Sequence, residues 1–278
     1  MIHRSQIKFH ETFQPEAGYL AKILELASNN YSGSKFEISE KTGIPTGKQK
    51  GKVEPHIKYA AFMGLLSYAC EKGKYQISLT DLGREVYVQD PYLHETLTKW
   101  LCHYGISRKE YGAPQWSFLI HDGNLGFIQG ISPERIMSQA SSIFESNVTF
   151  DEAFSVLRRS YMNGFFAELH YLTVEEDSGE YHFIESYEKD EFLYLYAYAI
   201  LNNWDARFPD QSEITVLELM EDLSFGKQFG LTDDSVGEVL EKLSEEGIIA
   251  INRQLYPATM IRTSTVNQVI PLLYSKLL

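Results

Sequence analysis

Lysine side chains gather in one stretch of a chain that is otherwise acidic. From Lys35 to Thr80 there are eight lysines and four glutamates, whereas the whole chain of 278 residues has a formal charge of -13. Five of these lysines surround one predicted helix and hairpin: Lys48, Lys50, Lys52, Lys58 and Lys74. Ammonium groups neutralise phosphates, and phosphate neutralisation supplies a large part of the affinity of proteins for DNA. The cluster therefore predicts contact with nucleic acid.

The elements that must position these lysines follow one another in an informative order. FEISEKTGI predicts a short helix that ends at Gly43. A second helix has apolar residues at helical spacing from Val53 to Leu65. Residues 68–79 alternate around the turn pair Lys72–Gly73, and Thr80 begins a further helix. This order is typical of a winged helix-turn-helix module.

A second set of residues that could do chemistry precedes the first predicted helix. His10 and Glu11 are adjacent, and such a pair in a loop can serve as a general base or as metal ligands. The same spacing suits a structural role, in which Glu11 or Thr12 caps the helix and His10 packs against the core. Spacing alone favours the structural interpretation, so a catalytic role for His10 and Glu11 is a hypothesis.

Three aromatic residues further along the chain have two interpretations. Trp100, His103 and Trp116 are of the type that stacks on the bases of an unwound strand. Residues at this helical spacing belong more often to a hydrophobic core. We favour the core interpretation.

Motifs that mark common catalytic sites are absent from the sequence. It has no GxxxxGK[ST] or GxGxxG phosphate motif, no GxSxG elbow, no HExxH helix and no PD-(D/E)xK-type run. Cys102–His103 has no second pair at zinc-like separation, so no metal site is predicted. The residues alone therefore indicate no catalytic constellation.

Charge is divided unevenly between the two ends of the chain. Residues 1–90 hold twelve Lys/Arg and ten Asp/Glu, whereas residues 91–278 hold thirteen and twenty-eight. This asymmetry suggests a first part that faces nucleic acid and an acidic remainder that keeps the protein soluble or docks partners. Two cysteines, Cys70 and Cys102, imply no disulfide framework. Because no apolar run has the length of a signal peptide or a membrane span, we expect a cytoplasmic protein with no membrane association.

The pattern predicts a mainly α fold with a minor α+β part, in three regions. These are an N-terminal winged helix-turn-helix over 1–90, a helical middle region over 91–188 and a C-terminal winged-helix-like module over 189–278. In the last region, a helix over 232–246 carries two aspartates and four glutamates against one lysine. Phosphate would repel such a helix, so we interpret this module as a protein-contact surface.

Several segments of the chain together resemble one family. They occur in this order: FHETFQPEAGYL, TGIPTGKQKGKVEPHIKYAAFMGLL, LTDLGREVYVQDPYLHETLTKWLCHY, APQWSFLIHD and SFGKQFGLTDDSVGEVLEKL. The order resembles that of the SspB-like proteins, a domain-of-unknown-function family associated with bacterial DNA phosphorothioation and phage-defence operons. The resemblance spans nearly the whole chain.

The resemblance implies a role in sulfur modification of the DNA backbone. It implies binding to duplex DNA and, in the single-stranded systems, nicking of one strand, for which a divalent metal such as Mg would be the cofactor. The partners implied are a cysteine desulfurase, a sulfur transferase and an ATPase, and a homodimer would suit symmetric DNA sites. Two other interpretations remain open: a non-enzymatic protein-protein adaptor and a winged-helix transcriptional regulator.

Overall fold

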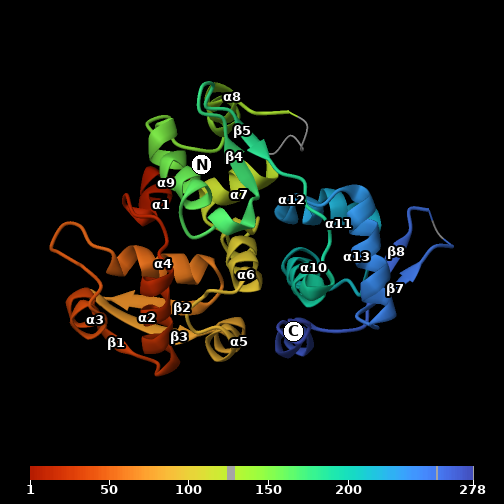
Figure 1. Cartoon of the computed structure of the whole chain (residues 1–278), viewed down its shortest axis with the longest axis horizontal. Helices are drawn as coiled ribbons and strands as arrows, with labels where there is room; N and C mark the ends of the chain where they lie inside the picture. The colour runs from red at the N-terminus through yellow and green to blue at the C-terminus, as the bar shows by residue number, and fades with distance from the viewer. Residues whose placement is uncertain (124–128, 255, 278) are drawn as a thin grey trace. The chain divides into compact units, whose positions relative to one another are not determined.

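The structure describes residues 1–123, 129–254 and 256–277. They form helices and small antiparallel sheets joined by loops (Figure 1). This computed structural model divides into two units, Met1–Phe183 and Ile184–Leu278. Helices dominate both units and the strands are short. The predicted mainly helical fold with a minor sheet part is confirmed in this form. The finer division at residues 90 and 188 stays a prediction.

The first sheet and its helices contain the lysine-rich stretch. The elements follow in this order: α2 (Ala17–Ser28), β1 (Ser32–Ser34), α3 (Lys35–Thr42), α4 (Val53–Phe62), β2 (Leu66–Glu71), β3 (Lys74–Leu79) and α5 (Asp81–Gln89). Strand β3 lies between β1 and β2, and both pairings are antiparallel. Tyr75, Ile77 and Leu79 are buried on β3, which packs against α2. The alternating pattern in the sequence therefore reflects one buried face of this sheet.

Local signals in the sequence mark the ends of these helices, and the end at Gly43 and the start at Thr80 were predicted. The Ser34 hydroxyl accepts the Glu37 N–H at the start of α3, and Gly43 ends that helix with a φ of 70°. The Thr80 hydroxyl accepts the Gly83 N–H at the start of α5. Each side chain satisfies a backbone donor that a helix start leaves unpaired.

The rest of the first unit is mostly helical. Its elements are α1 (Arg4–Ile7), η1 (Lys8–His10), α6 (Thr96–Ser107), α7 (Pro114–His121), α8 (Pro133–Ala140), α9 (Phe150–Met162), η2 (Ala167–Leu169), β4 (Leu172–Val174) and β5 (Tyr181–Phe183). Trp100, His103 and Trp116 are all buried here. The His103 ring lies 2.6 Å from the hydroxyl of Tyr161. These aromatic residues form core, as the spacing favoured, and offer no face to a nucleic-acid base.

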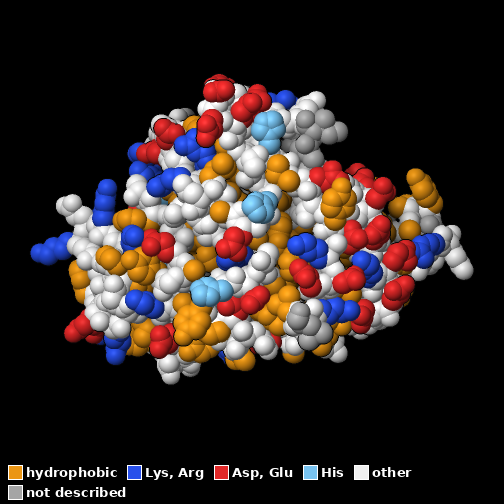
Figure 2. Space-filling view, in the orientation of Figure 1, with side chains coloured by type: hydrophobic (Ala, Val, Ile, Leu, Met, Phe, Trp, Pro, Cys, Tyr) orange, Lys and Arg blue, Asp and Glu red, His pale blue; other side chains and the backbone are white. Residues whose placement is uncertain are grey.

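The second unit repeats the strand arrangement of the first sheet. Its elements are η3 (Asp190–Phe192), α10 (Leu193–Arg207), β6 (Glu213–Thr215), α11 (Val216–Glu221), α12 (Phe225–Phe229), α13 (Asp233–Glu245), β7 (Ile249–Asn252), β8 (Thr259–Arg262), α14 (Val266–Val269) and η4 (Ile270–Leu272). The strand order β6-β8-β7 matches β1-β3-β2, and α13 precedes its hairpin as α4 does. Acidic side chains gather on the face over α11 and α13 (Figure 2).

Three short elements have no clear signal in the sequence. The stretch NNYSGS has the composition of a loop but contains β1, and the glycine-containing stretch LSFGKQFGL contains α12. Ile214 lies in β6, directly before α11. Both strands have three residues and pair with strands far along the chain, so no local alternation marks them. Helix α12 has five residues with Phe225 and Phe229 buried, so packing rather than length stabilises it.

No helix in the described ranges combines the length and apolar character that crossing a membrane requires.

Candidate nucleic-acid interface

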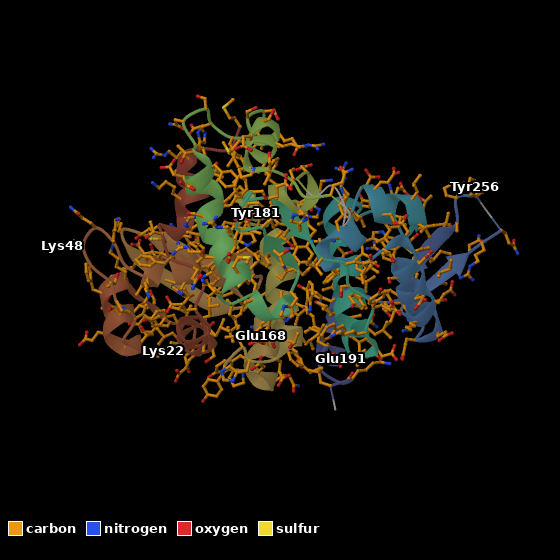
Figure 3. The ribbon with its side chains drawn as sticks, turned by 45° about the horizontal axis from the view of Figure 1, so that its top comes forward. Lys22, Lys48, Glu168, Tyr181, Glu191 and Tyr256 are labelled. Atoms are coloured by element: carbon orange, nitrogen blue, oxygen red, sulfur yellow. The ribbon has the colours of Figure 1, made fainter. Side chains whose placement is uncertain are left out.

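The loop between α3 and α4 presents two of the predicted lysines to solvent. Thr46 and Gly51 form an antiparallel bridge that closes residues 46–51 into a narrow loop. Lys48 and Lys50 are exposed on it, and Figure 3 shows Lys48 directed away from the helices. Within the described ranges, neither lysine has a carboxylate within 4.0 Å. Their charges are therefore available to an anionic ligand.

Gly51 gives this loop its shape. A Cβ atom at Gly51 would lie 2.2 Å from Oγ1 and 2.6 Å from Cα of Thr46. Because real Cβ atoms do not approach other atoms so closely, any other residue would force the two sides of the loop apart. The Gly51 N–H donates to Oε2 of Glu11 at 3.3 Å, which ties the loop to the segment before α2.

The hairpin β2–β3 carries a second pair of exposed lysines. Lys72 and Gly73 form its two-residue turn, with φ values of 50° and 76°, as a tight turn between antiparallel strands requires. Lys72 and Lys74 are exposed, and neither has an ion-pair partner within 4.0 Å among the described residues. The predicted site residue Lys74 thus lies at the tip of the hairpin.

Lys52 differs from the other predicted lysines because its charge is neutralised within the fold. Its Nζ lies 2.7 Å from Oε1 of Glu16. It also lies 5.1 Å from the ring centre of Tyr19 and 5.5 Å from that of Phe13. The hydrogen bond that Lys52 donates to the Glu16 carboxylate raises the pKa of Lys52 above its usual value. Lys52 therefore holds the start of α4 rather than extending into solvent.

Lys58 lies on the one partly exposed stripe of α4. Six residues of this helix are buried, whereas Glu54, Lys58 and Phe62, four residues apart, keep partial exposure. Glu54 accepts hydrogen bonds from Lys35 at 2.8 Å and from the Tyr75 hydroxyl. Its charge is thus matched by Lys35, and within the described chain Lys58 has no ion pair within 4.0 Å.

His10 and Glu11 lie at the end of η1, next to the basic loop. His10 is buried, and burial lowers its pKa to about 4. Its Nδ1 lies 3.2 Å from the carbonyl oxygen of Glu11, whereas its Nε2 has no hydrogen-bond partner among the residues that the structure describes. Glu11 has a φ of 54°, which is uncommon for a residue other than glycine. A catalytic role for the pair stays a hypothesis.

The segment 11–16 closes over the first turns of α4. Besides the bond from Gly51 to Glu11, the Tyr59 hydroxyl donates to the carbonyl of Phe13 at 2.8 Å. The Glu16 N–H donates to Nε2 of His56 at 3.2 Å. This acceptor role fixes His56 as a neutral ring, and burial lowers its pKa to about 4. The HETFQPE motif therefore positions α4 and the basic loop.

A pocket of about 640 Å³ lies beside the exposed stripe of α4. Lys58 and Phe62 of α4 and Tyr68 of β2 form one side. The turn between α6 and α7 forms the other, with Lys109 and Tyr111 among its lining residues. Its volume falls within the roughly 300–1,000 Å³ of small-molecule sites.

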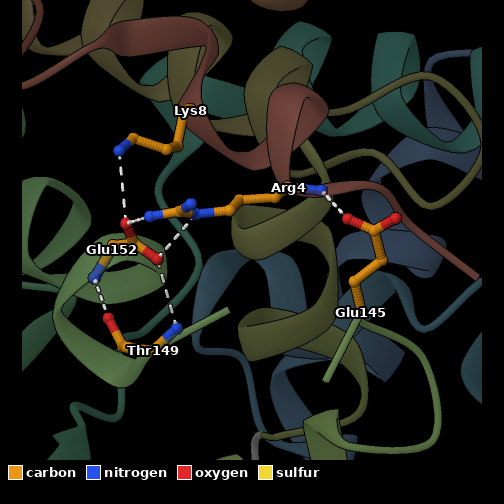
Figure 4. Close-up of polar contacts among 5 residues, drawn as sticks. All are labelled: Arg4, Lys8, Glu145, Thr149 and Glu152. Atoms are coloured by element: carbon orange, nitrogen blue, oxygen red, sulfur yellow. Dashed lines mark hydrogen bonds and ion pairs between the residues drawn. The ribbon is translucent and has the colours of Figure 1, made fainter. Parts of the chain in front are cut away.

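The N-terminal helix α1 forms a third wall of this pocket through Ser5 and Gln6, and Figure 4 shows how that helix is held. The Arg4 guanidinium and the Lys8 ammonium both contact the carboxylate of Glu152 on α9. The hydrogen bond from Arg4 is the main cause that lowers the pKa of Glu152 to about 2. The Arg4 N–H donates to Glu145 at 2.7 Å. The wall is thus anchored at both ends of α1.

Sequence reasoning missed the residues of the α6–α7 turn. The guanidinium of Arg108 lies 5.5 Å from the ring centre of Tyr111, which is 62% exposed. The only available signal was the run SRKEYGAP, in which basic residues and an aromatic precede a glycine. That run says nothing of α4, which the fold brings to the same pocket.

One group of side chains in the described part of the chain could hold a metal ion: Glu175, Glu180 and His182. Their ligand atoms lie within 4.8 Å of one another, on the hairpin that joins β4 and β5. Carboxylate and imidazole suit several first-row divalent metals. The sequence predicted no metal site, and it gave no spacing that would have singled out these three residues. Exposed acidic groups often lie together without a metal.

Residues 8–269 match the family described as Protein of unknown function (DUF4007), and the chain belongs to this family. No curated protein matches it. The fold is similar to that of a structure described as "Magnesium ion-bound SspB crystal structure", with a TM-score of 0.77, and of one described as "SspB crystal structure", with 0.75. Each is 17% identical in sequence, and each alignment covers 97% of this chain and 88% of the other. The predicted resemblance to SspB-like proteins is confirmed, and at this identity the likeness to the solved structures is one of fold.

Proposed function

We propose that this chain is the duplex-DNA-binding component of a DNA phosphorothioation-type modification or defence system. One observation carries the proposal: Lys48 and Lys50 on the α3–α4 loop and Lys74 on the β2–β3 hairpin are exposed, and none of the three has a carboxylate within 4.0 Å among the described residues. These segments flank α4 in the chain. Such lysines bind phosphates through charge and are insensitive to base sequence.

The order of elements supports a winged helix-turn-helix interpretation of this region. Helix, strand, two helices and a hairpin follow one another from α2 to β3, with β3 central in the sheet. In many such modules the helix before the hairpin enters the major groove. Here α4 is largely buried, so the loop and the hairpin, rather than α4, would contact the duplex. In this proposal the loop and the hairpin therefore bind the phosphates of the DNA backbone.

Fluorescence anisotropy with a fully paired duplex tests this binding. We expect binding that weakens steeply with salt in the wild type. The triple variant Lys48→Ala, Lys50→Ala, Lys74→Ala should bind more weakly, with a salt slope smaller by about 0.9 for each lysine. Lys22→Ala, which removes an exposed lysine of α2, is the matched control. Equal slopes for the triple variant and the control would refute the proposal.

The second unit supports a complementary proposal of partner binding. Asp234, Glu238 and Glu241 are exposed on α13, the helix that takes the place of α4 in the repeated arrangement. Phosphate would be repelled there, whereas a basic protein surface would be attracted. The partners proposed from the family resemblance are the cysteine desulfurase, the sulfur transferase and the ATPase of the modification operon. Co-elution with one of them, lost when these three residues are changed to Lys, is the expected result, and co-elution that survives the change would exclude this surface.

Nicking of one DNA strand is the enzymatic extension of the proposal. It is supported by the family resemblance and by the description of a similar fold as magnesium-bound. Relaxation of supercoiled plasmid with Mg or Mn tests it. Equal nicking by the wild type and by the His10→Ala, Glu11→Ala double variant would exclude these two residues from catalysis.

A further inference from the structure

The partly exposed stripe of α4 faces a pocket rather than open solvent. Lys58 and Phe62 line the pocket together with Ser5 of α1 and with Tyr111 and Pro114 beyond α6. A helix that reads DNA must enter a major groove about 12 Å wide with its flanks free. Elements on the opposite side of the pocket prevent this for α4. Whatever α4 contacts here must have the size of a small molecule or of one nucleotide.

We propose that this pocket receives a single unpaired nucleotide of the bound DNA. The inference rests on the proposed function, because the lysine loop and hairpin would hold the duplex from which the nucleotide comes. Aromatic rings form much of the lining: Phe9, Phe62, Tyr68, Tyr111 and Phe118. Phe9 and Phe62 pack edge to face at 4.8 Å. Rings of this kind stack on any base, whatever its identity.

Two of these rings are placed to meet a base that enters from solvent. Tyr111 is 62% exposed and Tyr68 is 40% exposed, although both are large side chains that proteins tend to cover. An extrahelical base would bury them. Paired bases could not, because stacking within the duplex hides their faces.

The charges around the pocket suit a nucleotide better than an apolar ligand. Lys58 lines the pocket and has no ion pair within 4.0 Å in the described part of the chain, so its ammonium can meet the phosphate. Asp122 and Glu110 also line the pocket, and a carboxylate accepts hydrogen bonds from the amino groups of bases. The pocket thus offers an ammonium group to the phosphate and carboxylates to the amino group of a base.

Backbone hydrogen bonds hold the turn that carries Tyr111. The Gly112 N–H donates to the carbonyl of Arg108 at 2.9 Å, and the Ala113 N–H donates to that of Ile106 at 2.8 Å. A Cβ atom at Gly112 would lie 2.4 Å from the carbonyl oxygen of Arg108. Because this turn is already ordered, stacking on Tyr111 requires little further loss of conformational freedom.

Fluorescence anisotropy with two duplexes tests nucleotide binding in the pocket separately from duplex binding by the lysine loop and hairpin. One duplex is fully paired, and the other is the same duplex with one unpaired nucleotide. We expect the wild type to prefer the second, and Tyr111→Ala to reduce that preference by about 5- to 140-fold, the range that base stacking supplies. Binding of the paired duplex should be unchanged in this variant, since the lysine loop and hairpin are intact.

Two further variants keep the test decisive. Tyr92→Ala removes a tyrosine that is 67% exposed elsewhere in the first unit and should keep the full preference. Lys58→Gln should reduce it. Equal affinity of the wild type for the two duplexes, or a preference that survives Tyr111→Ala, would overturn the pocket proposal. Neither result would bear on whether the paired duplex binds in a salt-dependent way, and that measurement tests the proposed function by itself.

Discussion

Replacing Lys52 with alanine should destabilise the protein without weakening its contact with DNA phosphates. The ammonium of Lys52 pairs with Glu16 at 2.7 Å, and both side chains are partly exposed, so the pair contributes about 0–1 kcal/mol to the free energy of unfolding. The rings of Tyr19 and Phe13, at 5.1 Å and 5.5 Å, add about 0.5–1 kcal/mol each as cation–π contacts. We therefore expect the free energy of unfolding to decrease by about 1–3 kcal/mol.

The exposed lysines of the loop should behave in the opposite way. Lys48 and Lys50 have no carboxylate within 4.0 Å in the described ranges, so their replacement should change the stability by less than about 0.5 kcal/mol. Their double Ala variant should nevertheless reduce the salt slope of duplex binding by about 1.8. Lys52→Ala should leave that slope unchanged, because Glu16 already neutralises the ammonium.

Urea unfolding and an anisotropy salt series on the same three proteins separate the two effects. The reasoning would be refuted if Lys52→Ala were as stable as the wild type. It would equally be refuted if Lys52→Ala flattened the salt slope as much as the loop variant does. Either result would mean that the ion pair with Glu16 does not hold Lys52 in solution.

Two further predictions concern the loop and the buried histidines. Gly51→Ala should weaken duplex binding although it removes no charge, because a Cβ atom there would displace the loop by contact with Thr46. Gly18 has open space around it, so Gly18→Ala should bind duplex as the wild type does. Equal affinities of the two variants for duplex would contradict the loop geometry. Burial lowers the pKa of His10 and His56 to about 4, whereas an unfolded histidine titrates near about 6.5. The unfolded chain therefore binds more protons between these values, and stability should fall as the pH decreases from about 6.5 to about 4, by up to about 1.4 kcal/mol per pH unit for each ring. Urea unfolding of His56→Gln at several pH values should give a shallower decline, and an unchanged decline would place the titration elsewhere.

The sequence was sufficient for those parts of the fold that local chemistry determines. The predicted stop at Gly43 and the helix start at Thr80 are present. The hairpin turn at Lys72–Gly73 is also where the alternation indicated. Each of these features depends on backbone conformations or hydrogen bonds that neighbouring residues supply.

Features that depend on contacts between distant residues were beyond sequence reasoning. Lys52 is a lysine of the same cluster as Lys48, and nothing in the local sequence distinguishes the two. Its ion-pair partner, Glu16, lies thirty-six positions away in the chain. In the same way, Tyr111 follows Lys58 by more than fifty residues, and only the packing of α6 and α7 brings both to one pocket. Charge counts along the chain cannot separate a neutralised lysine from an exposed one.

Modification of Cys70 offers the most direct test of the central claim that the loop and hairpin grip duplex DNA. This thiol is exposed on β2, opposite Tyr75 in the β2–β3 hairpin, whereas Cys102 is buried and burial raises its pKa. Because the thiolate is the reactive form, an alkylating reagent should modify Cys70 selectively. Saturating duplex should slow the alkylation of Cys70. High salt should restore the original rate of alkylation, and so should the triple variant Lys48→Ala, Lys50→Ala, Lys74→Ala, because both weaken duplex binding. An unchanged rate of Cys70 alkylation while anisotropy reports bound duplex would contradict the account.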